Sequence, residues 1–316
     1  MPLDHYVSQV HLRNFASPRI NGLLRVIRKS DLARFNTLPR NVCRIENNSS
    51  NKYLRDSRAI EEFLPEVEPH YNASVDKLRS NNIDQRCVVA IAGFAAYVST
   101  CSPAAMRIRS GLFRSSVETT SFILDRQGVF GKAPPALGGK SLTELLTDGE
   151  VRVDIDPKYP QAMGITSIIK FVSRWGNSRW QILLNEHVDD PFFTSDFPVA
   201  IETFGLNVAT NRILPLAPDV AVRIIPDIEQ ARAKDDLSFS KLRVLHRRLS
   251  RAEVHALNRL VVRCAEDLVF HRDDQAWIEP FVEKNREYRI ESESQRIPHG
   301  SGFLQIETER IKLKKK

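Results

Sequence analysis

The chain has 316 residues, of which 42% are hydrophobic and 27% charged, and its formal net charge is +7. This length suits one large domain or two small ones with a sizeable core, and no stretch approaches the roughly 18 apolar residues that a membrane span needs. The four cysteines lie far apart without a CxxC pair, and no apolar run of a signal peptide follows the first basic residues. We therefore expect reduced thiols, no structural zinc site, no membrane partner and a cytoplasmic protein.

The first third of the chain combines a turn signal, a polar stretch and a helical pattern. Asn21-Gly22 is a strong tight-turn dipeptide, which predicts a small hairpin or a turn into a strand. Residues 47–51 are polar and are predicted to form an exposed loop. Apolar residues then recur every three or four positions from Ser57 to Ser80, which predicts a helix that Pro65 and Pro69 kink or divide.

Further helices and then a group of strands are predicted in the middle of the chain. Helices are expected from Asp84 to about Thr100, from Pro103 through Leu112 and from Ile165 to Trp175, with a loop rich in Gly and Pro at 128–140. Short strands separated by turn residues are expected at 180–184, 192–194, 199–201, 213–216 and 220–225. A last helix is predicted from Ser250 to about Phe270, because Ser250 and Glu253 form a capping box before an apolar stripe.

This order of elements predicts an α+β fold with a mainly helical first half, a small, mostly antiparallel sheet and a closing C-terminal helix. We expect one domain over residues 1–275. Residues 276–316 read as a polar to basic C-terminal extension that is partly disordered.

The first fifteen residues are rich in polar side chains that alternate with apolar ones. If Ser8 begins a helix, His5 lies just outside its N-terminus and Gln9 lies in its first turn. The helix dipole opposes positive charge there, so His5 is expected to stay neutral, as a base or a metal ligand does. Equally, His5 and Gln9 could serve only to satisfy buried backbone groups.

A second polar group follows the predicted strand at Phe192-Phe193. Thr194-Ser195-Asp196 precedes a turn at Pro198, which places an acid at the edge of a sheet, where Asp196 could hold a cation or orient His5. The alternative is a turn in which Ser195 and Asp196 bond to nearby backbone.

Two helical positions complete the candidate residues. Glu68 belongs to a group of acids on the predicted helix, and Asn258 lies at the edge of the apolar stripe of the last helix. A solvated acidic face and an amide that holds a neighbouring loop are the structural alternatives.

The opening HYVSQVHLRNF and the phrase FFTSDFPV resemble the DUF4238 family, a bacterial family of unknown function, and the resemblance extends from His5 to the helix around Asn258. It implies that Thr194 to Val199 form one functional unit, that Glu68 matches an acid of the family's helix and that Asn258 matches a family Leu/Ile-Asn pair. Where many members carry Arg-Thr-Pro after the second helix, this chain has Thr100-Cys101-Ser102-Pro103, with Arg107 and Arg109 following. Cys101 could be a nucleophile beside a histidine, or simply a small buried residue.

Several catalytic motifs are missing from the sequence. It contains no P-loop, no GxGxxG, no GxSxG and no HExxH, so we expect no nucleotide cofactor and no α/β-hydrolase or zincin chemistry.

The candidate residues and the positive charge favour phosphodiester chemistry. The hypothesis is a metal-dependent nuclease or phosphodiesterase that acts in defence or as a toxin, with His5, Gln9, Asp196 and Asn258 as the catalytic group. Asp196, Glu68 and His5 would hold Mg²⁺ or Mn²⁺, and Arg13, Arg107 and Arg109 would hold phosphate. The alternative is a non-catalytic regulatory module with a buried polar network, whose basic surface and Lys314–Lys316 tail contact nucleic acid or an acidic protein.

Overall fold

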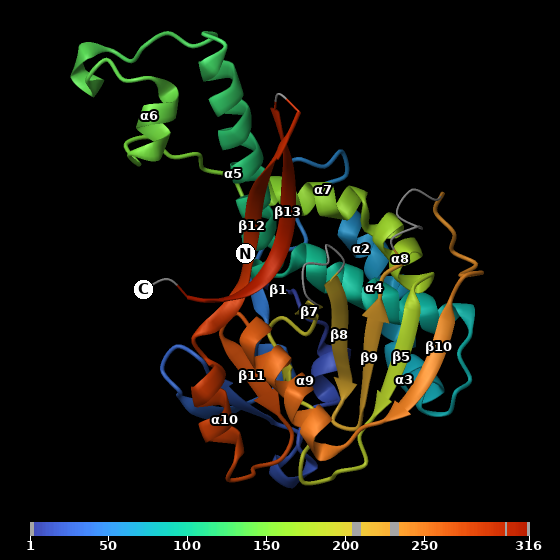
Figure 1. Cartoon of the computed structure of the whole chain (residues 1–316). Helices are drawn as coiled ribbons and strands as arrows, with labels where there is room; N and C mark the ends of the chain where they lie inside the picture. The colour runs from blue at the N-terminus through green and yellow to red at the C-terminus, as the bar shows by residue number, and fades with distance from the viewer. Residues whose placement is uncertain (1–2, 204–209, 228–233, 301, 315–316) are drawn as a thin grey trace.

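We describe residues 3–203, 210–227, 234–300 and 302–314 of a computed structural model. They form an α+β structure with several small, mostly antiparallel sheets. Figure 1 shows a body built around a five-stranded sheet, from one end of which a helical arm and a long hairpin project.

The five-stranded sheet has the strand order β10-β5-β9-β8-β7. Its strands are β5 (Arg179–Leu184), β7 (Ala200–Thr203), β8 (Thr210–Ala217), β9 (Val220–Ile225) and β10 (Arg243–Arg248). Neighbours pair antiparallel except β10, which runs parallel to β5. Most residues of the middle strands are buried, and helices cover one side of the sheet (Figure 1). On the other face Arg223 of β9 forms an ion pair with Glu202 of β7 at 2.9 Å.

A second sheet joins two strands near the N-terminus to two strands from the second half of the chain. Its order is β3-β2-β11-β6, from β2 (Leu24–Arg28), β3 (Arg34–Thr37), β6 (Thr194–Ser195) and β11 (Leu268–His271), and all pairs are antiparallel. Separately, β1 (Leu3–His5) pairs antiparallel with β4 (Arg44–Glu46).

The helices lie in two groups along the chain, and α5 and α6 form the projecting arm (Figure 1). The first group is α1 (Gln9–Arg13), α2 (Ala59–Phe63), α3 (Tyr71–Arg79) and α4 (Gln85–Cys101). The second is α5 (Pro103–Arg126), α6 (Leu142–Thr147), α7 (Lys158–Thr166), α8 (Ile168–Gly176), α9 (Arg251–Cys264) and α10 (Ile278–Asn285). The central helix α4 is buried on nearly every side, as its sequence predicts. Asp84 caps it by accepting a hydrogen bond from the Cys87 N–H at 2.8 Å.

Several local expectations are confirmed. The capping box of Ser250 and Glu253 begins α9. Two 3-10 turns, each with a proline in its first turn, separate α2 from α3 at Pro65 and Pro69, because proline cannot supply an interior helical N–H. The third helix starts at Pro103 as expected but runs on to Arg126.

Two parts of the predicted architecture are wrong. The first half is not mainly helical, because residues 3–46 contribute β1 to β4. The chain does not close on a helix either: α9 ends at Cys264, and β11, α10 and two long strands follow. The pairing partners of β2 and β11 lie at opposite ends of the chain, and a local hydrophobic pattern carries no information about such pairing.

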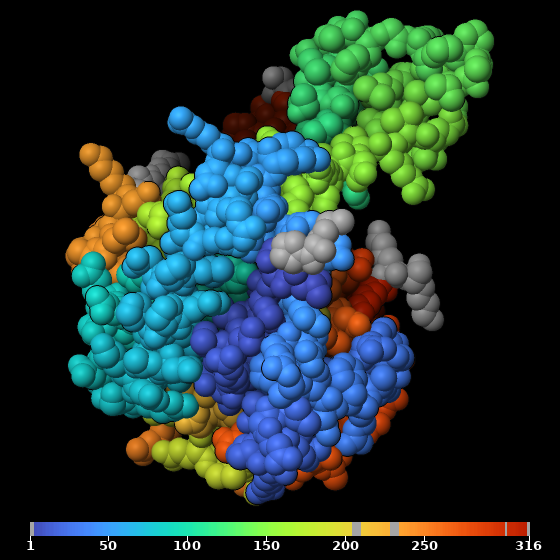
Figure 2. All heavy atoms as spheres, turned by 180° about the vertical axis from the view of Figure 1, so that it is seen from behind, coloured from blue at the N-terminus to red at the C-terminus, as the bar shows by residue number. Residues whose placement is uncertain are grey.

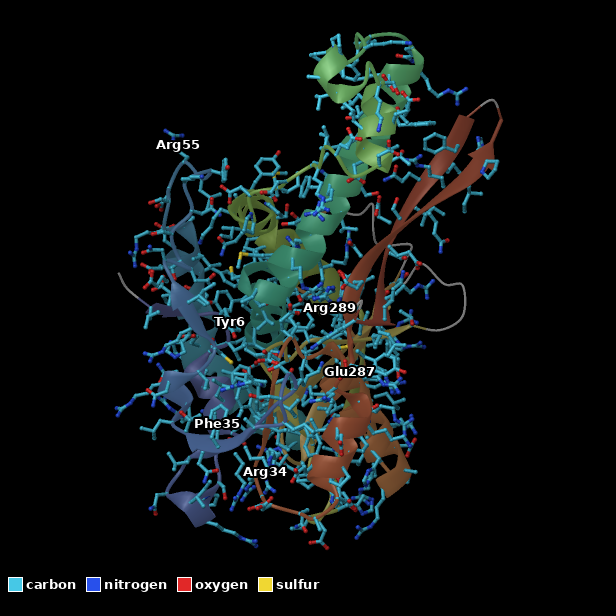
Figure 3. The ribbon with its side chains drawn as sticks, turned by 90° about the vertical axis from the view of Figure 1, so that its left-hand side faces the viewer. Tyr6, Arg34, Phe35, Arg55, Glu287 and Arg289 are labelled. Carbon is cyan, nitrogen blue, oxygen red and sulfur yellow. The ribbon has the colours of Figure 1, made fainter. Side chains whose placement is uncertain are left out.

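The C-terminal extension is more regular than the disorder that we expected. The strands β12 (Tyr288–His299) and β13 (Gly302–Leu313) form an antiparallel hairpin along α5. The hairpin starts beside Glu287 and Arg289 and runs outward, next to the projecting end of α5 (Figure 3). Arg107 of α5 fixes its base through ion pairs with Glu291 at 3.1 Å and with Glu266 at 2.7 Å.

The loop at 47–51 is also different from the exposed loop that we expected, because much of it is buried. Asn48 and Asn51 are each 1% exposed. The Asn51 amide donates to Lys158 O and Gln161 Oε1, and the Gln161 amide donates to Asn48 O. The polar residues of this loop therefore attach it to α7 rather than to water.

Within the described ranges, no single helix has the length and apolar character to cross a bilayer. Only α4 and α5 taken together pass that test, and they are bent by 62°.

Candidate functional site

Four of the residues predicted from the sequence line one open pocket of about 370 Å³. They are His5, Gln9, Arg13 and Glu68. The remaining lining residues are Leu3, Asp4, Val10, Ser49 and Leu64. Figure 2 shows the face on which the N-terminal segment lies beside the segment of residues 50–80, and the pocket is formed where these segments meet.

The local structure explains why these side chains converge. His5 lies opposite Arg44 in the β1–β4 pair, so the first strand is held at a fixed register. The chain then turns at Ser8 into α1, on which Gln9 and Arg13 are four residues apart and share one face. Arg13 donates to the Gln9 side-chain oxygen at 3.2 Å. In the described parts of the chain, Arg13 has no carboxylate partner.

The Nε2 atom of the His5 imidazole is buried and has no hydrogen-bond partner. The backbone of Arg40 lies near enough to the ring to raise the pKa of His5. Burial is the main reason why the pKa of His5 is lowered, and the charge of Arg44 acts in the same direction. His5 is therefore neutral at pH 7.

Glu68 is held at the pocket by the segment between α2 and α3. It begins a 3-10 turn with Pro69, and the Ser8 hydroxyl donates to Glu68 Oε1. The negative charge of Glu68 raises the pKa of His5, against the effect of burial. The carboxylate and the imidazole are thus close enough to interact electrostatically, which supports their assignment to one site.

Asp196 and Asn258 do not line this pocket. Asp196 is 4% exposed, and both oxygens of its carboxylate accept backbone N–H groups: Oδ1 from Glu266 at 2.8 Å, and Oδ2 from Asp267 and Leu268 at 2.8 and 2.9 Å. Burial raises the pKa of Asp196 to about 6, while these donors and the Lys29 ammonium act in the opposite direction. Asp196 therefore holds the loop that leads from α9 into β11.

Lys29 shares this buried region with Asp196. Its side chain is almost inaccessible, and Nζ donates to Ala265 O at 2.6 Å and Tyr288 O at 2.8 Å. Burial lowers its pKa to about 8, and Asp196 acts against that shift. A lysine and an aspartate thus tie the end of α9 to the second sheet and to the start of the hairpin.

His11 is a polar residue that the sequence analysis did not select. It is fully buried, with Nδ1 2.7 Å from the Tyr71 hydroxyl and Nε2 2.8 Å from the Thr194 hydroxyl, and its ring stacks on Phe94. Burial lowers its pKa to about 3. Thr194 of the TSD phrase thus binds a histidine inside the core. The sequence signal that could have identified His11 is its place between the apolar residues Val10 and Leu12, two positions after Gln9.

Asn258 links α9 to the segment before β6. It is inaccessible, its side-chain oxygen accepts the Phe193 N–H at 2.9 Å, and its amide donates to Pro191 O at 2.9 Å. These contacts match the structural alternative, in which the amide holds a neighbouring loop.

Replacing Asn258 by Ala is expected to lower the free energy of unfolding by about 1–3 kcal/mol, because a buried N–H and a buried carbonyl lose their partners. Thermal unfolding followed by circular dichroism measures this. Asn72→Ala on the exposed face of α3 is the control and is expected to change stability by no more than about 0.5 kcal/mol. Equal melting temperatures for the two variants would contradict the role of Asn258.

The other candidates lie elsewhere. Arg107 is engaged by Glu266 and Glu291, and Arg109 packs over the Phe171 ring at 5.1 Å. Burial raises the pKa of the Cys101 thiol to about 12, which disfavours the thiolate that a nucleophile needs. Arg13 is therefore the predicted phosphate ligand that lines the pocket.

The predicted divalent-metal site does not fit this arrangement. Asp196 Oδ1 and Oδ2 already accept backbone N–H groups, and Asp196 does not share the pocket of His5 and Glu68. Among the described residues, no group of three His, Cys, Asp or Glu side chains is placed to hold a metal ion.

Comparison with protein families identifies the chain. Residues 4–275 match the family described as "Protein of unknown function (DUF4238)", and the chain belongs to this family. The match ends shortly before α10 and the hairpin. No curated protein and no solved structure matches the chain.

Proposed function

We propose that the protein is a nuclease or phosphodiesterase that works at the pocket of His5, Gln9, Arg13 and Glu68. One observation carries this proposal: the pocket is lined by a neutral imidazole, by the carboxylates of Asp4 and Glu68, and by Arg13, a cation without a carboxylate partner among the described residues. A base, an acidic group that stabilises the imidazolium and a phosphate ligand are what phosphodiester cleavage requires. Asp196 and Asn258 keep a structural role in this proposal.

The test is cleavage of labelled DNA and RNA by purified protein, with Mn²⁺ and with EDTA. We expect His5→Ala to lower the rate at least about 100-fold, as the loss of a general base does. His299→Ala on the exposed end of the hairpin is the matched control and is expected to leave the rate unchanged. Folding of both variants is checked by their melting temperatures.

Cleavage by His5→Ala and Glu68→Gln at the wild-type rate would contradict this site. Cleavage that depends on Mn²⁺ would support the predicted metal, bound through ligands other than Asp196. A role in bacterial defence or as a toxin predicts that expression slows growth and that His5→Ala relieves the effect.

A second candidate function is a non-catalytic regulatory module that binds nucleic acid or an acidic protein. The buried hydrogen-bond networks of His11, Asp196 and Asn258 favour this module. They stabilise the fold, and that role is enough to explain why these polar residues are present. Lys314 lies at the end of the hairpin, and Lys315 and Lys316 of the predicted basic tail lie outside the described residues. Salt-sensitive binding without cleavage, unchanged in His5→Ala, would support the module.

We also propose a cytoplasmic location. All four cysteines are buried and free, which is typical of a protein from a reducing compartment.

A further inference from the structure

We propose that three exposed arginines beside the pocket, Arg13, Arg40 and Arg44, bind the phosphate backbone of a polynucleotide. This inference rests on the proposed function for the class of ligand, and it specifies that the ligand is a polymer and not a small phosphodiester. DNA and RNA share these backbone phosphates, so binding assays with both are needed to distinguish them.

The N-terminal part of the chain carries a large excess of positive charge. Residues 13–45 contain eight Lys and Arg residues and one acid, Asp31. Four of these arginines pair with carboxylates, in the pairs Arg19–Asp273, Arg25–Asp274, Arg28–Asp31 and Arg34–Glu279. In the parts of the chain that the structure describes, no carboxylate pairs with Arg13, Arg40 or Arg44, and all three are exposed. They therefore supply positive charge that the protein itself does not neutralise.

Neighbouring elements bring these arginines to the pocket. Arg44 lies opposite His5 in the β1–β4 pair, so the two side chains are on the same face. Arg40 belongs to the 3-10 turn Pro39–Asn41, which packs against α1, the helix that carries Arg13. Figure 2 shows these N-terminal segments, in dark blue to blue, side by side on one face of the molecule.

The carboxylates of the pocket also bear on where a phosphate binds. Asp4 Oδ2 accepts a backbone N–H at 2.9 Å, and Glu68 Oε1 accepts a serine hydroxyl. Both line the pocket, where their negative charge opposes a phosphate, whereas Arg40 and Arg44 lie outside the lining residues. The backbone is therefore expected to run beside the pocket along the arginines, and only Arg13 reaches the pocket wall.

Three separate cations suit a ligand with several phosphates. Successive phosphates of one strand can contact all three guanidinium groups, whereas a dinucleotide has one internucleotide phosphate. Each phosphate contact releases counterions, so the logarithm of the affinity falls with the logarithm of the salt concentration by about 0.7–0.9 per contact. At 0.1 M salt this corresponds to about fivefold to eightfold in affinity for each arginine.

The test is fluorescence anisotropy with labelled RNA and DNA of about 12 nucleotides, in EDTA, at salt concentrations from about 0.05 to 0.2 M. Arg13→Gln, Arg40→Gln and Arg44→Gln are each expected to weaken binding about fivefold to eightfold at 0.1 M salt and to lower the salt slope by about 0.7–0.9. The losses should be equal on RNA and DNA, since only phosphates are contacted, and the polymer that the wild type binds more tightly is the ligand.

The matched control is Arg28→Gln. It removes the same charge from the same segment, but Arg28 is already paired with Asp31 at 3.1 Å, so the affinity is expected to change less than about twofold. Melting temperatures check that all variants fold. A loss in Arg28→Gln as large as in the other three variants would show a general effect of charge and would overturn the inference.

Three further results would overturn it: unchanged affinity and salt slope in the three variants, a dinucleotide that binds as tightly as the longer strand, or a poly-glutamate peptide of equal charge that binds as tightly. The proposed function fails separately. If the three variants bind as the wild type but His5→Ala abolishes cleavage, the inference is wrong and the enzyme stands. If they lose binding as expected but the wild type cleaves neither polymer, with or without Mn²⁺, the enzyme is wrong and the arginines remain a binding surface.

Discussion

Replacing Asp196 by Ala is expected to lower the free energy of unfolding by about 3–5 kcal/mol, the usual cost of removing one member of a buried charged group. Three backbone N–H groups between Glu266 and Leu268 lose their acceptor, and Lys29 loses its nearby negative charge inside the protein. Asp196→Asn keeps the shape of the side chain but places an NH₂ group against backbone N–H donors. We therefore expect a smaller decrease in the free energy of unfolding than for Asp196→Ala. Urea unfolding followed by tryptophan fluorescence measures both.

The control for Asp196 is Asp274→Asn. Asp274 forms ion pairs with Arg25 and Arg34 at the surface, with a side chain that is 45% exposed, and such pairs contribute at most about 1 kcal/mol. If Asp196→Ala were as stable as Asp274→Asn and had lost cleavage of nucleic acid, the original assignment of Asp196 as a catalytic residue would be restored.

Acid is expected to destabilise the protein through His11. The unfolded chain protonates His11 near its ordinary pKa of 6.5, whereas the folded protein does so only near pH 3. The unfolded state therefore binds more protons as the pH falls, and the stability that the neutral ring provides above pH 6.5 is progressively lost. The loss amounts to about 2 kcal/mol at pH 5.

Stability curves at pH 7 and pH 5 for His11→Asn and for His299→Asn test this prediction. The His11 variant should be less stable at pH 7 but lose less stability on acidification, and the exposed His299 variant should behave as the wild type. Should His11→Asn not fold, an NMR titration of the wild-type imidazole gives the same information. Protonation of His11 above pH 5 in the folded protein would contradict the argument.

Much of the fold and part of the site could be predicted from the sequence because their signals are local. Apolar spacing predicts α4, and the capping box marks the start of α9. Three pocket residues lie within nine positions at the start of the chain: His5, Gln9 and Arg13. The short strand β1 and the helix α1 are therefore enough to bring them together.

The rest depends on contacts between distant segments. Asp196 was grouped with His5 because both are polar and match the family's phrases, but its partners at 266–268 are backbone groups, which no side-chain pattern reveals. For a related reason we predicted that the residues of β11 belong to the last helix. Leu268 to Phe270 continue the apolar stripe of α9, and only the pairing with β2 and β6 makes them a strand.

The pairing of β2 with β11 has a consequence for the order in which the protein is made. Arg28 and Leu268 are register partners, and so the ribosome must add roughly 240 residues before β2 meets its neighbour. At about 5–20 residues per second, that interval lasts roughly 12–50 s. During this time β2 exposes one unpaired edge, and the His11 ring lacks its hydroxyl partner until Thr194 has been translated. Assembly of the N-terminal segment is thus a late event of biosynthesis, although its residues are the first to be translated.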